Sequence, residues 1–212
     1  EGKFFRANFP ADFIAEGLDQ TRGWFYNMLV LSVGLFGESA YRNVIVNGLI
    51  LAEDGQKMSK RLKNYPDPSY IIDTYGADAL RYYMLSLPVV RGETLYFSEK
   101  GVDEIYKKII LRLENVLAFY ELYKNLKTKN EKRKTKNVLD RWIVERLAVI
   151  VKVTQDALDN YTLDKATCEI GGFIDDLSVW YIRRSRDRLK AEEDDGARAT
   201  IQYVLQEFSK II

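Results

Sequence analysis

The chain has 212 residues, of which 47% are apolar, and its 32 Lys and Arg residues nearly balance 31 Asp and Glu residues. The near-zero net charge excludes a global basic field for nucleic acid, so any such binding depends on local charge. A single cysteine, Cys168, and the absence of histidine exclude internal disulfides, Cys/His zinc sites, and Ser-His or Cys-His nucleophilic catalysis.

The composition also bears on location and completeness. The longest apolar run, residues 28–36, is interrupted by Ser32 and Gly34 and is shorter than the ~20 residues of a membrane-spanning helix. We therefore expect no membrane segment, and the low cysteine content suits the cytoplasm. The chain begins without Met and stops in a helical pattern at "EFSKII", so we expect a piece of a longer protein.

The first half of the chain alternates strand and helix signals. A short apolar run before Gly17 predicts a strand, and a helical period follows over residues 21–35, with Gly37 as its stop. A β-branched run around Gly48 predicts one further strand. The Asp54-Gly55 pair after it indicates an exposed loop.

Two short helices are predicted next. Asp67 suits an N-cap, Pro68 suits the first helical position, and Gly76 suits the stop. A second helix over residues 77–87 ends before Pro88. The alternation continues to about residue 98 and argues for an α/β layer.

From Glu99 onward the strand signals vanish and an all-α helical bundle is predicted. Its helices are expected at 99–127, 138–160 and 164–190, with another starting near 196. The third carries a buried stripe of apolar residues at three- and four-residue steps, namely Ile170, Ile174, Leu177 and Tyr181. The expected divisions are 1–98 (α/β), 99–136 (a connecting helix and a basic linker) and 137–212 (the bundle).

Three smaller features of this half have simple interpretations. The stretch 124–136 holds seven basic residues and one acidic residue, which is typical of a solvated, mobile connection. Trp142 and Trp180 are expected to anchor the bundle core. Cys168 is expected to pack as a small apolar residue.

The stretch "EGLDQTRGW" lies where a strand ends and a helix begins, the usual place for ligands in an α/β sheet. Gly17 would let a ligand approach the backbone, and polar side chains for sugar hydroxyls or an ammonium group come from Glu16, Asp19 and Gln20. The alternative is structural: Asp19 or Thr21 caps the helix and Trp24 belongs to the core.

The loop "QKMSKRLK" has complementary chemistry. Lys57, Lys60, Arg61 and Lys63 fall within seven positions. Lysine ammonium groups on a flexible loop can stabilise the charge that moves onto departing pyrophosphate, and Ser59 adds a hydroxyl donor. The alternative, a solvated basic surface, is not excluded by spacing alone.

Five ordered motifs together resemble a known family. "KMSKR" at 57–61 is similar to the second signature loop of class I aminoacyl-tRNA synthetases, and "AEGLDQTRGWF" resembles the preceding segment of the isoleucine, valine and leucine subgroup. "GADALRYYMLSLPVVRGE", "LDRW" and "WYIRRSRDR" fit the same family. The combination looks most like the isoleucyl-tRNA synthetase family, in the type of eukaryotic cytoplasm and some bacteria, and favours isoleucine over valine.

The resemblance implies roles for individual residues. Lys57 and Lys60 would contact the ATP phosphates, and Met58 would offer backbone contacts to adenine, beside Ser59. Gly17 and Asp19 would hold the ribose hydroxyls of the adenylate, with Glu16 beside them. Gln20 would lie near the aminoacyl group, and Trp24 would form a wall of the isoleucine pocket. Arg61 stands where many members have Ser, so its role stays open.

The family also implies the reaction and the partners. Isoleucine and ATP, with Mg²⁺ that needs no metal site in this segment, would form isoleucyl-adenylate, and the acyl group would pass to isoleucine tRNA. The α/β half would be the C-terminal part of a Rossmann-type catalytic domain, and the protein would be a monomer. The family's first signature, His-x-Gly-His, and its editing domain are absent, so the chain alone is expected to be inactive.

The helical half resembles the anticodon-binding bundle of the family. Arg183, Arg184, Arg186 and Arg188 spread around their helix, so they cannot all face one partner. Those expected to contact tRNA phosphates are Arg183, Arg184 and Arg186, and some arginines are expected to pair with Asp175, Asp176 or Asp187.

Two alternatives to an isoleucine enzyme stay open. The first is the valine or leucine enzyme. The second is a non-catalytic tRNA-binding or scaffold protein that kept the synthetase fold. We also expect the 57–61 loop to be mobile when ATP is not bound.

Overall fold

A computed structural model describes residues 2–124, 137–191 and 195–212, and the predicted basic linker after Lys124 lies outside them. The chain divides into two compact units. The strand-containing unit comprises Glu1–Asp67 and Leu87–Ser98, and the helical unit comprises Pro68–Ser86 and Glu99–Ile212. Residues 68–86 thus belong with the helices, although the sequence places them among the strands.

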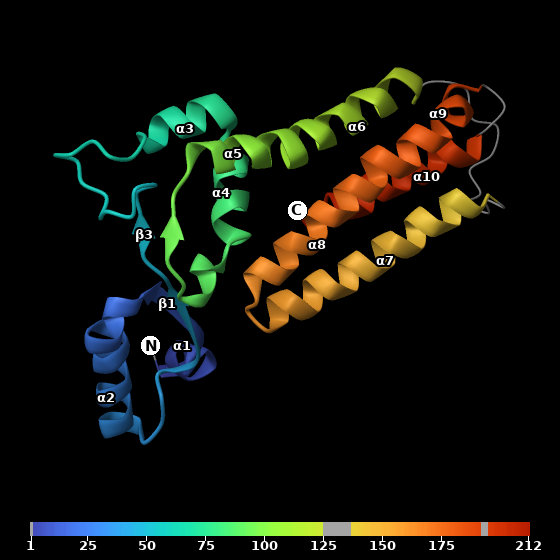
Figure 1. Cartoon of the computed structure of the whole chain (residues 1–212). Helices are drawn as coiled ribbons and strands as arrows, with labels where there is room; N and C mark the ends of the chain where they lie inside the picture. Colours follow the sequence, from blue (N-terminus) through green and yellow to red (C-terminus); the bar gives the residue numbers. More distant parts are fainter. Residues whose placement is uncertain (1, 125–136, 192–194) are drawn as a thin grey trace. The chain divides into compact units, whose positions relative to one another are not determined.

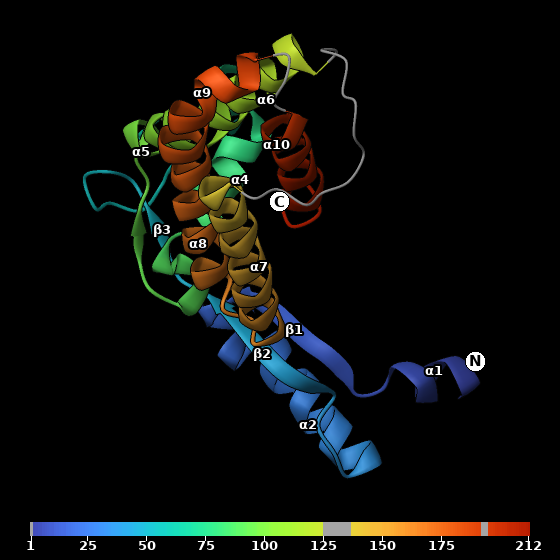
Figure 2. The ribbon, with the colours of Figure 1, turned by 90° about the vertical axis from the view of Figure 1, so that its right-hand side faces the viewer.

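The strand-containing unit begins with a helix and a parallel strand pair. Its elements are α1 (Gly2–Asn8), β1 (Ala11–Gly17), the 3₁₀ helix η1 (Leu18–Arg22), α2 (Trp24–Phe36) and β2 (Tyr41–Asn47). β1 pairs with β2 from Ala11 opposite Tyr41 to Gly17 opposite Asn47 (Figure 2). η1 and α2 form the crossover that parallel neighbours need. Gly37, with φ of 76°, ends α2 as predicted.

A second parallel pair joins β3 (Ile50–Leu51) to β4 (Leu95–Tyr96), after the 3₁₀ turn η2 (Pro88–Arg91). The single strand predicted around Gly48 is therefore wrong, because β2 and β3 belong to different sheets. The break occurs where another segment passes close by. Gly48 N donates to Val89 O at 2.7 Å, and a Cβ at Gly48 would lie 1.8 Å from Glu93 O.

The apolar helix α2 is largely uncovered within this unit. Only Phe25 and Ser32 of its side chains are buried. Large apolar side chains that remain exposed on it include Trp24, Tyr26, Val30, Leu31, Val33, Leu35 and Phe36. The core of the strand-containing unit is correspondingly small.

The helical unit starts with α3 (Pro68–Tyr75) and α4 (Ala77–Leu85). The start at Pro68 and the stop at Gly76, whose φ is 85°, are as predicted. Two tyrosines of α3 are held by Glu99, the first residue of α5 (Glu99–Ile105), which follows α4 and β4 in the chain. The hydroxyls of Tyr70 and Tyr75 donate to Glu99 Oε1 at 3.1 and 3.0 Å.

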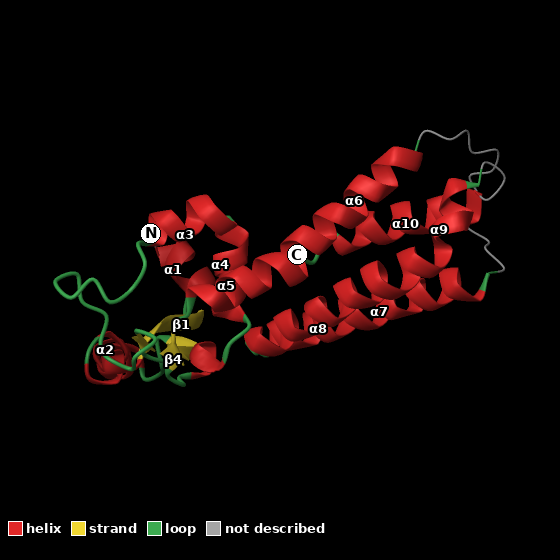
Figure 3. Cartoon of the chain, turned by 45° about the horizontal axis from the view of Figure 1, so that its top comes forward, coloured by secondary structure: helices red, strands yellow, loops and turns green. Residues whose placement is uncertain are grey.

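Long helices form the rest of the unit, as the sequence predicts (Figures 1 and 3). They are α5 (Glu99–Ile105) continued by the π-helical turn η3 (Tyr106–Ile110) and α6 (Leu111–Tyr123), α7 (Val138–Asp159), α8 (Leu163–Asp175) continued by the π-helical turn η4 (Asp176–Ile182) and α9 (Arg183–Lys190), and α10 (Asp195–Phe208). α7 and α8 lie side by side, as Figures 1 and 2 both show. None of the described helices is long and apolar enough to cross a membrane.

The predicted stripe of Ile170, Ile174, Leu177 and Tyr181 is buried and lies in the main core. Side chains of α6, α7 and α10 complete that core, among them Val116, Ile143, Leu147, Ile150, Ile201, Val204 and Phe208. The fold class is as predicted, with an α/β part followed by a helical bundle. Trp142 packs against the core, but Trp180 is 46% exposed and Cys168 is also exposed, so two of the packing predictions were wrong.

Candidate functional site

The carboxyl end of β1 presents the first group of predicted site residues. Glu16 and Gly17 are the last residues of β1, and Asp19 and Gln20 lie in η1 immediately after it. The Asp19 carboxylate folds back over the strand end, where a Cβ on residue 17 would lie only 2.8 Å from Asp19 Oδ1. Asp19 is exposed and this oxygen is the far end of its side chain, so the present position of the carboxylate suits a glycine at 17 but does not by itself demand one.

Gln20 links this strand end to α2. Its Oε1 accepts from Trp24 N at 2.8 Å, and its Nε2 donates to Asp19 Oδ2 at 3.3 Å. The structural alternative of capping by Asp19 or Thr21 is thus incorrect, because the Thr21 hydroxyl donates to Leu18 O instead. Trp24 is 46% exposed and is not a core residue of this unit.

The basic loop that follows β3 begins with a short hairpin, which is part of the same unit. Leu51 and Lys57 form an antiparallel bridge, and Ala52 N donates to Gln56 O at 2.9 Å. The turn uses Gly55 at a φ of 81°, and Asp54 Oδ1 accepts from Gln56 N at 2.9 Å. Lys57 is therefore attached through its backbone to β3.

The second part of the loop is a turn closed by Asn64, which the sequence treats only as part of a family-specific stretch. Lys63 N donates to Ser59 O at 2.9 Å, and Lys63 has a φ of 48°. The Asn64 amide accepts from Ser59 N and donates to Lys57 O. No local sequence signal distinguishes this asparagine from an ordinary loop residue.

The charges of this loop are available to a ligand. Lys57, Lys60 and Arg61 are exposed, and within the part of the chain that the structure describes none of them forms an ion pair. Met58 and Ser59 between them are half-buried. A cluster of positive charge without ion pairs among the described residues, on a backbone held by hydrogen bonds, suits a polyphosphate.

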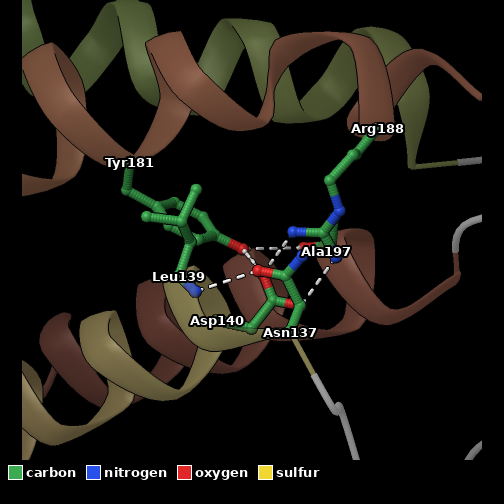
Figure 4. Close-up of polar contacts among 6 residues, drawn as sticks. All are labelled: Asn137, Leu139, Asp140, Tyr181, Arg188 and Ala197. Atoms are coloured by element: carbon green, nitrogen blue, oxygen red, sulfur yellow. Dashed lines mark hydrogen bonds and ion pairs between the residues drawn. The ribbon is translucent and has the colours of Figure 1, made fainter.

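In the helical unit, "LDRW" and "WYIRRSRDR" meet in a buried polar network (Figure 4). Asp140 is fully buried and receives two hydrogen bonds of 2.8 Å from the Arg188 guanidinium, and one of 3.0 Å from the Tyr181 hydroxyl. Burial and the neighbouring Asp140 carboxylate raise the pKa of Tyr181. Arg188 is therefore a structural arginine that joins α9 to the start of α7.

The ion pairs predicted for the arginines of "RRSRDR" are not the ones formed. Arg188 pairs with Asp140, whereas Asp175 pairs with Arg112 and Asp176 pairs with Arg146. These partners come from other helices. Sequence proximity therefore misled the prediction.

The other arginines of α9 are exposed, and two of them lie beside aromatic rings. The Arg184 guanidinium carbon is 3.9 Å from the centroid of the Trp180 ring, and that of Arg186 is 5.8 Å from the Phe119 ring. Arg183 and Arg186 also line a pocket of about 350 Å³, together with Asn115, Val116, Phe119, Ser178 and Ile182. The pocket lining combines apolar side chains with two arginine side chains, a combination that suits a nucleotide.

Among the described residues there is no group of three or more His, Cys, Asp or Glu side chains that could hold a metal ion. The side chains at the strand end and at the basic loop supply carboxylate, amide, hydroxyl, ammonium and guanidinium groups.

Comparison with known protein families gives one match in each half of the chain. Residues 1–96 match the family described as tRNA synthetases class I (I, L, M and V), and residues 140–212 match the anticodon-binding domain of tRNA ligase. The chain therefore belongs to the class I tRNA synthetase family, with part of a catalytic domain followed by an anticodon-binding domain.

At the level of individual proteins, the chain is similar to isoleucine–tRNA ligases. It is 52% identical over 213 residues to that of Chlamydia muridarum and 48% identical over 216 residues to that of Protochlamydia amoebophila. These alignments cover 97% and 99% of the chain but only 21% of either relative. The chain thus spans about a fifth of the length of the relatives it matches.

Solved structures support the fold. Methionyl-tRNA synthetase of Mycobacterium tuberculosis in complex with methionyl-adenylate has a TM-score of 0.74 at 21% identity, over 99% of this chain and 42% of its own. A leucine enzyme from Agrobacterium radiobacter K84, solved as a ternary complex with tRNA, has a TM-score of 0.64 at 18% identity, over 95% and 26%.

Proposed function

We propose that this chain is a segment of an isoleucine–tRNA ligase that activates isoleucine with ATP and transfers it to isoleucine tRNA. The observation that carries the proposal is that the basic loop and the carboxyl end of β1 occur in one unit. The sequence identity of about 50% to isoleucine–tRNA ligases supports the choice of amino acid. We further propose that the protein is located in the cytoplasm and that it is a monomer.

In the first step an isoleucine carboxylate oxygen attacks the α-phosphorus of ATP, and the bond to the β-phosphate breaks. Negative charge then grows on departing pyrophosphate. Lys57 and Lys60 stabilise that charge, with ATP carried as its Mg²⁺ complex. The exposure of both lysines and their lack of ion pairs among the described residues support this role.

The strand end holds the other parts of the adenylate in this proposal. Gly17 and Asp19 contact the ribose hydroxyls, with Glu16 beside them, and the backbone of Met58 contacts adenine near Ser59. Gln20 lies near the aminoacyl group, and Trp24 forms a wall of the isoleucine pocket. The bonds from Gln20 to both Asp19 and Trp24 N support a shared sugar and amino-acid site.

In the second step a terminal ribose hydroxyl of the tRNA attacks the acyl carbon and AMP leaves. The helical unit binds the tRNA, with Arg183, Arg184 and Arg186 contacting its phosphates. The pocket beside Arg183 and Arg186 supports this assignment, whereas Arg188 is excluded from it by its pairing with Asp140.

The test uses a chimera in which this chain replaces the matching 213 residues of the Chlamydia muridarum ligase. We expect isoleucine-dependent exchange of pyrophosphate into ATP. Lys60→Ala should lower the rate by about 10²–10³-fold, because a charge interaction made in the transition state is lost.

Lys3→Ala, which removes a lysine from the exposed helix α1, is the matched control and should leave the rate unchanged. Equal activity of the Lys60→Ala and native chimeras would refute the assignment, and exchange with valine or leucine in place of isoleucine would refute the specificity. The purified 212-residue chain alone is expected to show no exchange above background.

A further inference from the structure

The two lysines of the basic loop are held by different parts of the backbone. Lys57 is fixed by its bridge to Leu51 in β3, which itself pairs with β4. Lys60 lies beyond that hairpin, in the turn from Ser59 to Lys63, where no described residue belongs to a strand or helix. Something other than sheet pairing must set the distance between the two ammonium groups.

The Asn64 side chain supplies the connection. Its Oδ1 accepts from Ser59 N at 2.9 Å, and its Nδ2 donates to Lys57 O at 3.2 Å. The amide thus spans the backbone on both sides of Met58. The bond from Ser59 N is part-buried, so water competes less for it than on an open surface, whereas the bond to Lys57 O is exposed.

An asparagine side chain is suited to this position. It carries one acceptor and one donor group on a short stem, whereas aspartate cannot donate and alanine can do neither. The turn also includes Lys63 at a φ of 48°, a conformation that L residues other than Asn and Asp rarely adopt. The hydrogen bonds of Asn64 and the Lys63 N to Ser59 O bond hold the turn in this form.

We propose that Asn64 is a positioning residue for adenylate formation: it fixes the backbone around Met58 so that Lys57 and Lys60 face the triphosphate together. This inference rests on the proposed function of the loop. The phosphate contacts are made by the lysines, and Asn64 acts through them. Its loss leaves both charges in place but lets their separation vary.

The expected effect is on the rate constant. In the chimera, Asn64→Ala should lower kcat for pyrophosphate exchange by about 10- to 100-fold, since misplacement of a catalytic group by about 1 Å has effects of this size. KM for isoleucine should not change, because the amino acid is held at the strand end. Asn64→Asp, which keeps the acceptor and loses the donor, should also lower kcat.

Asn43→Ala is the matched control. Asn43 also lies in the strand-containing unit and also donates from Nδ2 to a backbone carbonyl, that of Asp12, at 2.8 Å. The Asn43→Ala substitution therefore removes a comparable hydrogen bond at a position away from the loop. Its kcat should stay within about twofold of that of the native chimera. A fall in kcat that is equal in Asn64→Ala and Asn43→Ala would overturn the inference.

A second measurement, hydrogen exchange in the chimera, does not depend on activity and separates this inference from the proposed function. Exchange of the Ser59 amide should be faster in Asn64→Ala than in the native chimera, and unchanged exchange would show that Asn64 does not hold the loop. An inactive native chimera would count against the proposed function and against any catalytic role of Asn64. An active chimera whose kcat is insensitive to Asn64→Ala would refute the inference alone.

Discussion

The arginines of α9 differ in their surroundings residue by residue, although four of them lie within six positions. Arg188 is held by the buried Asp140 carboxylate, and Arg184 stacks on the exposed Trp180 ring. Arg183 and Arg186 line the pocket beside α6. Only the last three can approach an RNA backbone, because the Arg188 guanidinium is already engaged.

The double substitution Arg183→Ala and Arg186→Ala should weaken binding of isoleucine tRNA to the chain. Loss of two phosphate contacts is expected to lower the affinity about tenfold or more and to reduce the slope of log affinity against log salt by about 2. Filter binding at several salt concentrations measures both quantities.

Arg81→Ala is the control for this measurement, because Arg81 is an exposed arginine of α4 that forms a surface pair with Asp78. It should leave the salt slope unchanged. Identical slopes for the double variant and the native chain would show that Arg183 and Arg186 are ordinary surface residues.

At the scale of elements, one carboxylate joins α7, η4 and α9, and the tyrosine bonded to it also reaches α10. Asp140 near the start of α7 accepts from Tyr181 of η4 and from Arg188 of α9, and the Tyr181 hydroxyl also lies 3.4 Å from Ala197 O of α10. A buried ion pair of this kind adds little over apolar packing, but removal of one partner leaves an uncompensated polar group.

Asp140→Ala should therefore lower the free energy of unfolding of the helical unit by about 3 kcal/mol. The value is at the low end of the range for broken buried pairs, because the Arg188 side chain is 23% exposed and can be partly solvated. Urea denaturation followed by far-ultraviolet circular dichroism provides the measurement.

Glu104→Ala removes the acidic partner of an exposed pair with Lys108, in which both side chains are more than half exposed. It should leave the free energy of unfolding almost unchanged, because exposed ion pairs contribute little to stability. If Asp140→Ala were no more destabilising than Glu104→Ala, the network would have no structural role.

At the scale of the whole molecule, the two units differ in how much apolar surface each buries. The helical unit has a continuous core with several fully buried side chains, among them Phe173, Leu177 and Tyr181. In the strand-containing unit most apolar side chains of α2 are exposed. The relatives of this chain are about five times longer, and we expect residues outside this segment to cover α2 in the chimera.

We expect amides of β1 and β2 to exchange with solvent much faster than amides of α8 and α10 in the isolated chain. Local stability follows buried apolar contact, so the strand-containing unit should open at a lower free-energy cost. Hydrogen exchange followed by mass spectrometry measures this difference. In the chimera, the β1 and β2 amides should become protected, and equal protection of both units in the isolated chain would contradict the expectation.

The residue patterns by themselves determined the fold class, most helix positions and the candidate site. A helical period, Pro68 at a start, and Gly37 and Gly76 at stops act within a few residues, so they can be recognised without the fold. The order of "EGLDQTRGW" and "KMSKR", together with the family resemblance that it carries, indicated an ATP-dependent activating site, whose individual residue roles stay predictions.

Only the tertiary structure decided which distant groups meet. Gly48 divides two strands because residues 89–93 pass against it, and Arg188 pairs with Asp140 across 48 positions. Trp180 and Cys168 are exposed because each lies on a face of its helix that points away from the core. Within the loop, it showed that Asn64 joins Lys57 to Ser59. Such contacts depend on the path of the folded backbone, which periodicity and composition do not specify.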